Sequence, residues 1–326
     1  MNEYGVLLSN SQLSWVRSDD DICFNSRVKY YRNSSGDLVP YEAMFSNRLA
    51  FRQSGFVDTE QQKEIDYRLD YQRTNAELFG NSFGDSRGYK SAALTKEELL
   101  DCSRRRAKRK IFDYCICNEF SLFITLTLDK SLIDRSDYSA VIKKLNSFLG
   151  NRVNRYGLKY IGVPEYHKNG GLHFHFATNG KGFKLENSGT VSVVARKKPI
   201  KVSTADRLGI PLEDRHTVYN ITDWKLGFST AIYTYGERGA LAQYLAKELN
   251  KDCQKKMVKN GSIDKIGGRW YLHGGKLCKP IVKLGNVNFD DIVDTTYELD
   301  TEGGKFKVLK LTEKGELLRY GSDKAE

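Results

Sequence analysis

The chain has 326 residues, with 52 Lys and Arg against 41 Asp and Glu, so its formal net charge is +11 and its pI about 9.2. A hydrophobic share of 40% with only five prolines is compatible with a buried core and excludes global disorder. No run approaches the ~18 uncharged apolar residues of a membrane helix, and the N-terminus lacks a signal-peptide pattern. We therefore expect a cytoplasmic protein without a membrane partner, and the positive charge favours nucleic acid as the partner.

Residues 1–93 are predicted to be a polar N-terminal extension. They contain turn-rich runs, such as Asn33-Ser34-Ser35-Gly36, and show no repeat and no firm hydrophobic period. The extension is expected to pack on the main domain or to cover it loosely. A second surface for nucleic acid is the alternative.

A helix is predicted to begin near Thr95, because Thr95 and Glu98 form a capping box. Six of the seven residues in 104–110 are basic. Such a run is most often a solvated helix face, but these cations could also neutralise several phosphates. With the charge of the whole chain in agreement, DNA contact is predicted for Arg104, Arg105, Arg106, Lys108 and Arg109.

The region that follows alternates strands with helices. Apolar and β-branched residues predict strands, and helical spacing of apolar residues with a glycine cap at Gly157 predicts one of the helices. In chain order we expect a strand at 121–128, a helix at 138–157, a hairpin of 158–167 with 172–179, a basic loop at 196–201, strands at 217–224 and 228–235, and a helix at 239–252. This order indicates an α+β fold in which helices pack on a central antiparallel sheet.

The hairpin carries the first candidate site. His173 and His175 alternate with phenylalanines, so both imidazoles lie on one face of the strand, about 7 Å apart. Two imidazoles so placed can bind one divalent cation, although two hydrogen-bonded surface histidines would show the same pattern. Three of the five histidines of the chain, His167 included, lie in this hairpin together with Glu165. Mixed imidazole and carboxylate ligands favour Mn²⁺ or Mg²⁺ over a closed zinc site.

The register of the hairpin decides which side chains share a face. If Asn169 and Gly170 form a two-residue turn, Glu165 faces Phe174 and lies on the wrong side of the sheet. A three-residue loop or one bulge places Glu165 opposite His175 and His167 opposite His173, with all four on one face. The metal hypothesis therefore requires an even register.

The second candidate lies in the last helix. Tyr244 and Lys247 are three residues apart and share a helix face, which Lys251 continues. A tyrosine at the edge of the core is the plain interpretation. A phenol is a poor nucleophile at neutral pH, and a nearby ammonium and a metal-bound phosphate would both favour the phenolate.

Three segments, in this order, resemble the motifs of the HUH endonucleases: 123–128 (FITLTL), 165–176 (EYHKNGGLHFHF) and 244–247 (YLAK). More narrowly, the chain is similar to the rolling-circle replication initiators of plasmids and single-stranded DNA phages, including the microvirus type. The similarity covers about residues 104–275. It departs from some phage initiators, which carry a second tyrosine on the last helix, because position 248 is Glu248.

The resemblance implies an HUH or ferredoxin-like nuclease core at 94–255, with 256–326 as a C-terminal appendage. It implies Glu165, His173 and His175 as ligands of Mn²⁺ or Mg²⁺, Tyr244 as the only nucleophile and Lys247 as its helper. DNA would be bound by the basic residues, Lys251 included.

The implied activity is nicking and joining of single-stranded or hairpin origin DNA through a 5′-phosphotyrosine. No P-loop motif accompanies the core, so a host helicase and polymerase are the expected partners. The alternative is a non-catalytic, RRM-like protein that binds single-stranded nucleic acid through aromatic base platforms and needs no metal.

Overall fold

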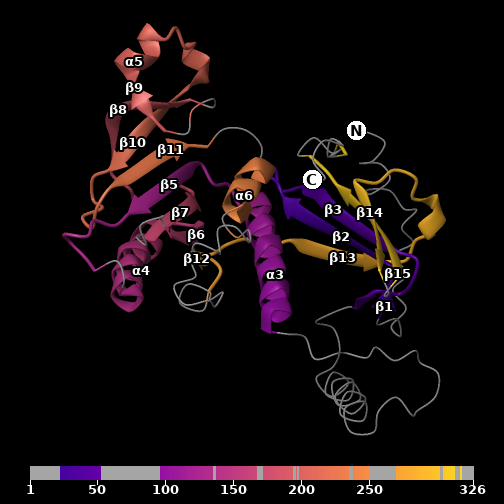
Figure 1. Cartoon of the computed structure of the whole chain (residues 1–326). Helices are drawn as coiled ribbons and strands as arrows, with labels where there is room; N and C mark the ends of the chain where they lie inside the picture. Colours follow the sequence, from indigo (N-terminus) through magenta and orange to yellow (C-terminus); the bar gives the residue numbers. More distant parts are fainter. Residues whose placement is uncertain are drawn as a thin grey trace. The chain divides into compact units, whose positions relative to one another are not determined.

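The computed structural model describes residues 23–52, 96–134, 137–166, 172–193, 196, 198–234, 238–247, 249, 269–301, 304–312 and 316–317. The chain divides into two compact units (Figure 1). Unit 1 consists of Met1–Thr95 with Ile281–Glu326, and unit 2 of Lys96–Pro280. The fold is α+β, with large antiparallel sheets and few helices.

Unit 1 is built around a five-stranded antiparallel sheet of order β13-β2-β3-β15-β14 (Figure 1). Its strands are β2 (Ser26–Arg32), β3 (Leu38–Ser46), β13 (Ile281–Gly285), β14 (Tyr297–Thr301) and β15 (Gly304–Lys310). Two short strands, β1 (Cys23–Phe24) and β4 (Phe51–Arg52), pair with each other. The core of the sheet includes Val28, Tyr30, Ala43, Phe45 and Leu309.

The boundaries of the two units differ from the expected ones at residues 93 and 256. Strand β2 pairs with β13, and β3 pairs with β15, so segments from both ends of the chain share one sheet. The sequence analysis assigned no strands to this part of the N-terminal region. Most residues of β2 are buried, so the alternation that marks a strand with one exposed face is missing there.

Unit 2 contains an eight-stranded antiparallel sheet of order β12-β6-β7-β5-β11-β10-β8-β9. Its strands are β5 (Leu122–Thr127), β6 (Tyr160–Tyr166), β7 (Leu172–Thr178), β8 (Leu185–Val193), β9 (Ile200–Lys201), β10 (Arg215–Ile221), β11 (Ser229–Tyr233) and β12 (Leu272–Gly274). Its helices are α3 (Lys96–Cys117), α4 (Tyr138–Tyr156), α5 (Val202–Arg207) and α6 (Arg238–Lys247).

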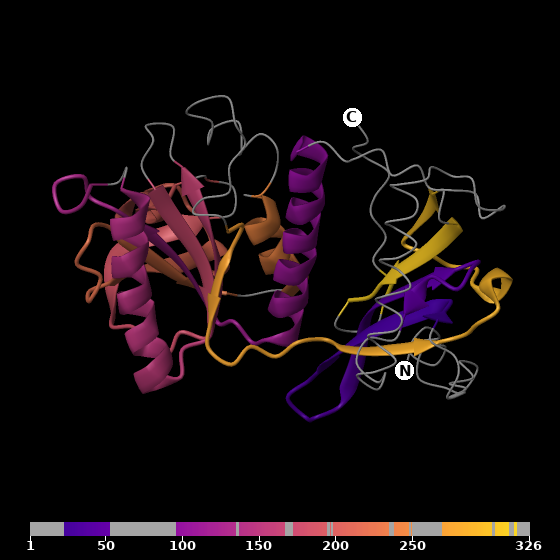
Figure 2. The same cartoon turned by 90° about the horizontal axis from the view of Figure 1, so that it is seen from below.

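Helices cover both faces of this sheet, and Figure 2 shows α4 on one side with α3 and α6 on the other. Alternate residues of β5 and β7, such as Ile124 and Phe176, are buried in the core beneath α4. The opposite face contributes Ala177 and residues of β6 to a second core, shared with α3 and α6. Each helix therefore covers the sheet with its own apolar stripe.

The predicted helices and strands of this region are confirmed, with boundaries that differ by a few residues. Helix α4 ends as expected at Gly157, which adopts a left-handed conformation with φ 68°. Helix α3 begins at Lys96, and the proposed capping residue Thr95 lies outside the described residues. Of the predicted buried thiols, Cys115 is buried beneath α3, and burial raises its pKa.

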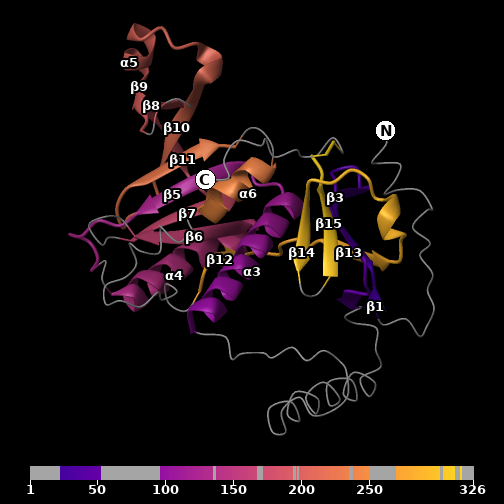
Figure 3. The ribbon, with the colours of Figure 1, turned by 45° about the vertical axis from the view of Figure 1, so that its right-hand side comes forward.

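Two features of unit 2 were not predicted. Strand β8 pairs with β10 along its length, and the segment taken as a basic loop contains β9 and leads into α5. These elements extend as an arm from the rest of the sheet (Figure 3). Within the part of the chain that the structure describes, no helix is long and apolar enough to cross a membrane.

Candidate functional site

The register of the β6–β7 hairpin places Glu165, His173 and His175 on one face of the sheet. Glu165 pairs with His173, and Val163 pairs with His175. The register is thus even, as the metal hypothesis required, but the expected pairing of Glu165 with His175 is wrong by two residues. Five residues separate β6 from β7, so the strands meet further from the connection than expected. His167 belongs to that connection, outside the described residues.

Glu165 contacts His175 diagonally across the two strands. The Oε2 atom of Glu165 lies 2.9 Å from Nε2 of His175, within hydrogen-bond distance. An ionised carboxylate only accepts hydrogen bonds, so the Nε2–H group of His175 donates to it. Diagonal pairs of long side chains commonly meet in this way on an antiparallel sheet.

Both histidines are also held from the other side, by threonines of β5. Thr125 Oγ1 is 3.1 Å from Nδ1 of His175, and Thr127 Oγ1 is 3.0 Å from Nδ1 of His173. The register of β5 with β7 places each threonine directly opposite its histidine. A hydroxyl group can donate or accept, so each threonine can hold its imidazole in either tautomer. The Nδ1 atoms are thereby fixed towards the sheet, and Nε2 is the ring nitrogen left for further chemistry.

Helix α6 brings Tyr244 to the same face. The Tyr244 ring is 6.4 Å from the His175 ring and 5.1 Å from the Phe123 ring, between centroids, and it meets both edge-on. Phe123 itself stacks on His175, with centroids 5.9 Å apart. Tyr244 is 49% exposed, because Ala242 and Leu245 supply the buried stripe of α6. The phenol is therefore a surface group beside the histidine pair rather than a core tyrosine.

The remaining predicted residues are more dispersed. Lys247 is the last residue of α6 and is exposed, one helical turn after Tyr244. Lys251 lies outside the described residues. On α3, exposed side chains belong to Arg105, Arg106 and Arg109, while Lys108 is partly buried.

Arg104 differs from the other predicted cations of α3. It is only 6% exposed, because it shares a stripe with Ala107 and Ile111 that faces the core. Its burial gives no support to the predicted phosphate contact, so the DNA contacts considered below use the exposed cations.

The sequence analysis missed three side chains of this face. Thr125 and Thr127 were recognised as the polar side of a strand but not as partners of the histidines. Phe228 precedes β11, and its carbonyl oxygen accepts a hydrogen bond from the Thr127 backbone N–H at 2.8 Å. Phe228 is 71% exposed. A large exposed aromatic residue bordering a strand of polar side chains is a signal that could have found it.

The donor set is not a complete metal cage. Among the described residues, no three His, Cys, Asp or Glu side chains gather closely enough to hold a metal ion. The carboxylate and imidazole atoms of Glu165 and His175 are nevertheless 2.9 Å apart. Neighbouring ligands of an octahedral ion are separated by about 3 Å, since each lies ~2.1 Å from the ion. This pair fits two adjacent positions around Mn²⁺ or Mg²⁺.

Fold and site together define an α+β protein with a carboxylate, two anchored imidazoles and an exposed phenol on one sheet face. The model of a replication-associated protein family, the ORF2 family, matches residues 121–253, about two fifths of the chain. The match runs from β5 to just beyond α6 and so includes every residue of this face discussed above. It supports a role in the initiation of replication. Neither the curated proteins nor the solved structures contain a match to the chain.

Proposed function

We propose that the protein is a metal-dependent endonuclease and strand transferase that nicks and rejoins single-stranded DNA at a replication origin. The observation that carries the proposal is the position of Tyr244, whose exposed ring lies beside His175 on the polar face of the sheet. A tyrosine needed only for packing would have its ring in the core. The family match to replication-associated proteins over the same residues supports the biological setting.

Glu165, His173 and His175 are the proposed ligands of Mn²⁺ or Mg²⁺. Such an ion, when bound, polarises a phosphate oxygen and stabilises the charge on the phosphoryl group. Binding replaces the hydrogen bond between Glu165 and His175. The His175 ring then carries its proton on Nδ1 and donates it to Thr125 Oγ1, a change that the hydroxyl group accommodates without moving.

The nucleophile is Tyr244. Its Oη atom attacks the scissile phosphorus, the bond from phosphorus to the 3′ oxygen breaks, and the phenolic proton finally resides on the released 3′-OH. The products are a 5′-phosphotyrosine and a strand whose 3′-OH can prime synthesis. The energy of the phosphodiester is retained in the covalent link, so a later 3′-OH can reverse the reaction without ATP.

Lys247 is the proposed helper of Tyr244. The two residues are three positions apart on α6, so their side chains leave the same face of the helix. A nearby ammonium group stabilises the phenolate relative to the phenol and makes attack possible nearer to neutral pH. Position 248 is a glutamate, so the proposed mechanism uses one tyrosine.

The DNA strand is proposed to follow the exposed aromatic and basic side chains around this site. Phe228 borders β5 at the end that carries Thr127, where an unpaired base could stack on its ring. The exposed cations Arg105, Arg106 and Arg109 of α3 are candidates for phosphate contacts. Single-stranded or hairpin DNA suits this arrangement, since stacking requires unpaired bases.

In its finer detail the proposal assigns the chain to the HUH type, similar to the initiators of rolling-circle plasmids and microvirus-type phages. The order of motifs along the chain supports this, with the FITLT strand first, the histidine pair second and the tyrosine helix last. An initiator of this kind relies on a host helicase and polymerase for unwinding and synthesis.

The test uses a pool of single-stranded oligonucleotides with a randomised centre, fixed ends and a 3′ fluorophore, because the 3′ fragment is the one that stays on the protein. With Mn²⁺, the wild-type protein should give a labelled band that survives denaturing electrophoresis, and sequencing its DNA should identify the origin. Tyr244→Phe should give none. Tyr156→Phe, at an exposed tyrosine of α4, is the matched control and should behave as wild type. An adduct of Tyr244→Phe as abundant as that of wild type would refute the assignment.

The RRM-like binding protein predicts a different outcome. Wild type would then retain the oligonucleotide pool in a salt-sensitive manner without any covalent band, and Mn²⁺ would have no effect.

A further inference from the structure

Three aromatic rings meet where α3 passes the edge strand β12. The His273 ring stacks with Tyr114 of α3 at 5.6 Å and with Tyr271 at 5.7 Å, with 29° between the ring planes in each pair. His273 is opposite Ile161 of β6 in the sheet, so its side chain projects on the face that α3 covers. His273 is exposed and the two tyrosines are partly so. The rings therefore form a platform that solvent reaches.

The chain on either side of this platform is tied to α3. Trp270 Nε1–H donates to Ser103 Oγ at 3.0 Å. Further along, the backbone N–H of Cys278 donates to Asn118 Oδ1 at 2.9 Å, and Asn118 Nδ2 donates to the Cys278 carbonyl oxygen at 3.0 Å. These bonds hold the segment from Trp270 to Cys278 at both ends, so the rings are preorganised.

A glycine allows β12 to approach the sheet this closely. A Cβ atom at Gly274 would lie 2.4 Å from the ring of Tyr160, a separation that side chains do not tolerate. The glycine-rich sequence 267–275 is thus explained in part by packing. The aromatic residues within it are not explained in this way, since His273 is exposed.

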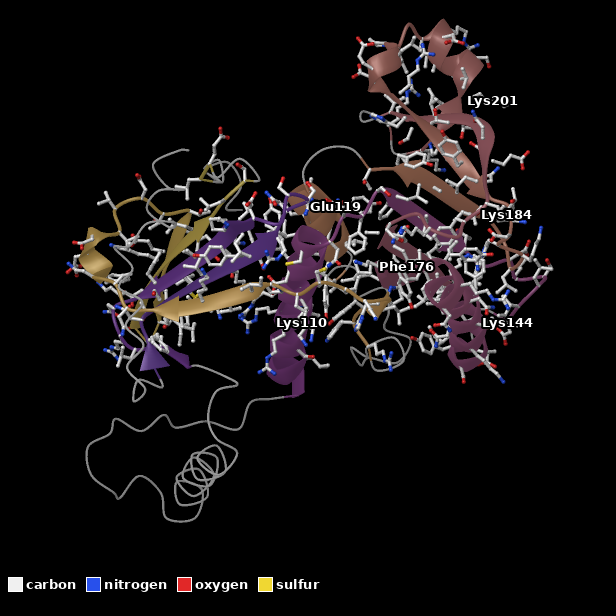
Figure 4. All side chains as sticks on the ribbon, turned by 180° about the vertical axis from the view of Figure 1, so that it is seen from behind. Lys110, Glu119, Lys144, Phe176, Lys184 and Lys201 are labelled. Atoms are coloured by element: carbon white, nitrogen blue, oxygen red, sulfur yellow. The ribbon has the colours of Figure 1, made fainter. Side chains whose placement is uncertain are left out.

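Three cations surround the rings. Burial is the main cause that lowers the pKa of His273, and the charges of Arg269, Lys110 and Lys279 lower it further, which requires all three to be close to the imidazole. Each of these cations is exposed. Lys110 lies one helical turn before Tyr114 on α3, where Figure 4 labels it. The platform therefore combines stacking surfaces with a local excess of positive charge.

We propose that Tyr114, Tyr271 and His273, together with Lys110, Arg269 and Lys279, form a second binding site for single-stranded DNA. Bases stack on the exposed rings, and the neighbouring phosphates contact the cations. The identity of the strand as DNA rests on the proposed function, whereas the binding chemistry stands on the ring and charge geometry alone.

The distance between the two sites fits one continuous strand. Only β6 separates β12 from β7, the strand that carries the histidine pair. Two strand spacings amount to about 10 Å, which corresponds to roughly three nucleotides at ~3.4 Å each. The second site is thus suited to DNA that flanks the scissile phosphate, where it would hold a strand while the ends are exchanged.

The test measures binding in the Tyr244→Phe background, which separates DNA binding from cleavage. The probe is fluorescein-labelled (dT)20, and fluorescence anisotropy gives Kd over a range of salt concentrations. Tyr271→Ala should weaken binding of (dT)20 about tenfold, since one stacked base is lost. Lys279→Gln should lower the slope of log Kd against log salt by about 0.7, the value for one phosphate contact with a single strand.

An abasic strand of the same length separates stacking from charge. It should bind the Tyr271→Ala protein as tightly as the parent protein, while Lys279→Gln should still weaken it. Inorganic phosphate at the same total charge should not compete with (dT)20, because the site requires a chain of phosphates. Lys144→Gln, at an exposed lysine of α4 labelled in Figure 4, is the matched control and should change neither quantity.

Unchanged binding and salt dependence in both Tyr271→Ala and Lys279→Gln would overturn the second site. Lys279→Gln keeps the test valid if Tyr271→Ala fails to fold, because an exposed lysine has no packing role to lose. The outcome is independent of cleavage. Wild-type protein that forms no covalent adduct would refute the nicking activity, and a tenfold loss on Tyr271→Ala would still establish the binding site.

Discussion

The two faces of the β5–β7 strand pair have opposite chemistry although the same residues of backbone build them. Beneath α4, Ile124 and Phe176 are fully buried in an apolar core. On the other face, one residue along each strand, Thr125 bonds to His175. The comparison teaches that the apolar face provides stability and fixes the register, while the polar face is free to carry groups that would be costly in a core.

The sharpest way to break this comparison is to change neighbouring residues of β7. His173→Ala should reduce Mn²⁺ binding and adduct formation by more than about a hundredfold, because an imidazole ligand is lost. Its free energy of unfolding should change by less than about 1 kcal/mol, since the side chain is only partly buried. Isothermal titration with Mn²⁺ and urea unfolding measure the two quantities.

Phe174→Leu is the matched control for that experiment. Phe174 is fully buried on the α4 face, so the change should destabilise the protein by about 1–3 kcal/mol and leave the affinity of the folded protein for Mn²⁺ unaltered. The distinction between the faces would be lost if Phe174→Leu weakened Mn²⁺ binding as much as His173→Ala does.

The threonines test whether the polar face positions its histidines. Thr125→Val and Thr127→Val keep the shape and β-propensity of the side chain but remove the hydroxyl group that holds each Nδ1. We expect a 10–100-fold loss of Mn²⁺ affinity, as for other groups that orient metal ligands. Ile124→Val should instead cost about 0.5–1.5 kcal/mol of stability and leave the affinity unchanged. Equal Mn²⁺ affinity in all three variants would show that the threonines have no such role.

Gly162 links the two faces. A Cβ atom there would lie 2.0 Å from the Phe176 ring and 2.4 Å from the His175 carbonyl oxygen. Gly162→Ala should therefore destabilise unit 2 by about 1–3 kcal/mol and also disturb the pairing that sets Glu165 against the histidines. Chemical denaturation measures the first effect and Mn²⁺ titration the second. A fully stable variant with normal affinity would mean that the strands can separate here without consequence.

The smallest expected effect concerns pH. The pKa of His273 is lowered in the folded protein by burial and by the cations around it. The unfolded chain then binds a proton at higher pH than the folded one does, so stability falls as the pH drops below about 6.5 and levels off once the folded protein is also protonated. His273→Asn should show a shallower loss between pH 7.5 and 5.5 in urea unfolding. An identical loss in both proteins would assign the pH dependence to other groups.

Local sequence signals were sufficient for much of unit 2. The alternation in β5 and β7 predicted which residues share a face, and the apolar spacing of α4 with Gly157 predicted that helix and its end. These signals work because period and capping are properties of neighbouring residues. The position of Tyr244 on the polar face depends on how α6 packs, which the motif order indicated only through resemblance.

Long-range pairing limited the rest. The bonds between Thr125 and His175 depend on the register of β5 with β7, which no turn between adjacent strands defines. The hairpin register was wrong by two residues because the length of its connection was misjudged. The sheet of unit 1 joins β2 to β13 across more than 250 residues of sequence, and a pairing of that kind leaves no local pattern.

Identification of the residue that becomes attached to DNA is the most direct test of the central claim. Wild-type protein is incubated with Mn²⁺ and the randomised oligonucleotide pool, the adduct is digested with nuclease and protease, and tandem mass spectrometry locates the nucleotide-bearing peptide. The nucleotide should be on Tyr244, linked through its 5′-phosphate. Attachment to any other residue, or through a 3′-phosphate, would contradict the mechanism.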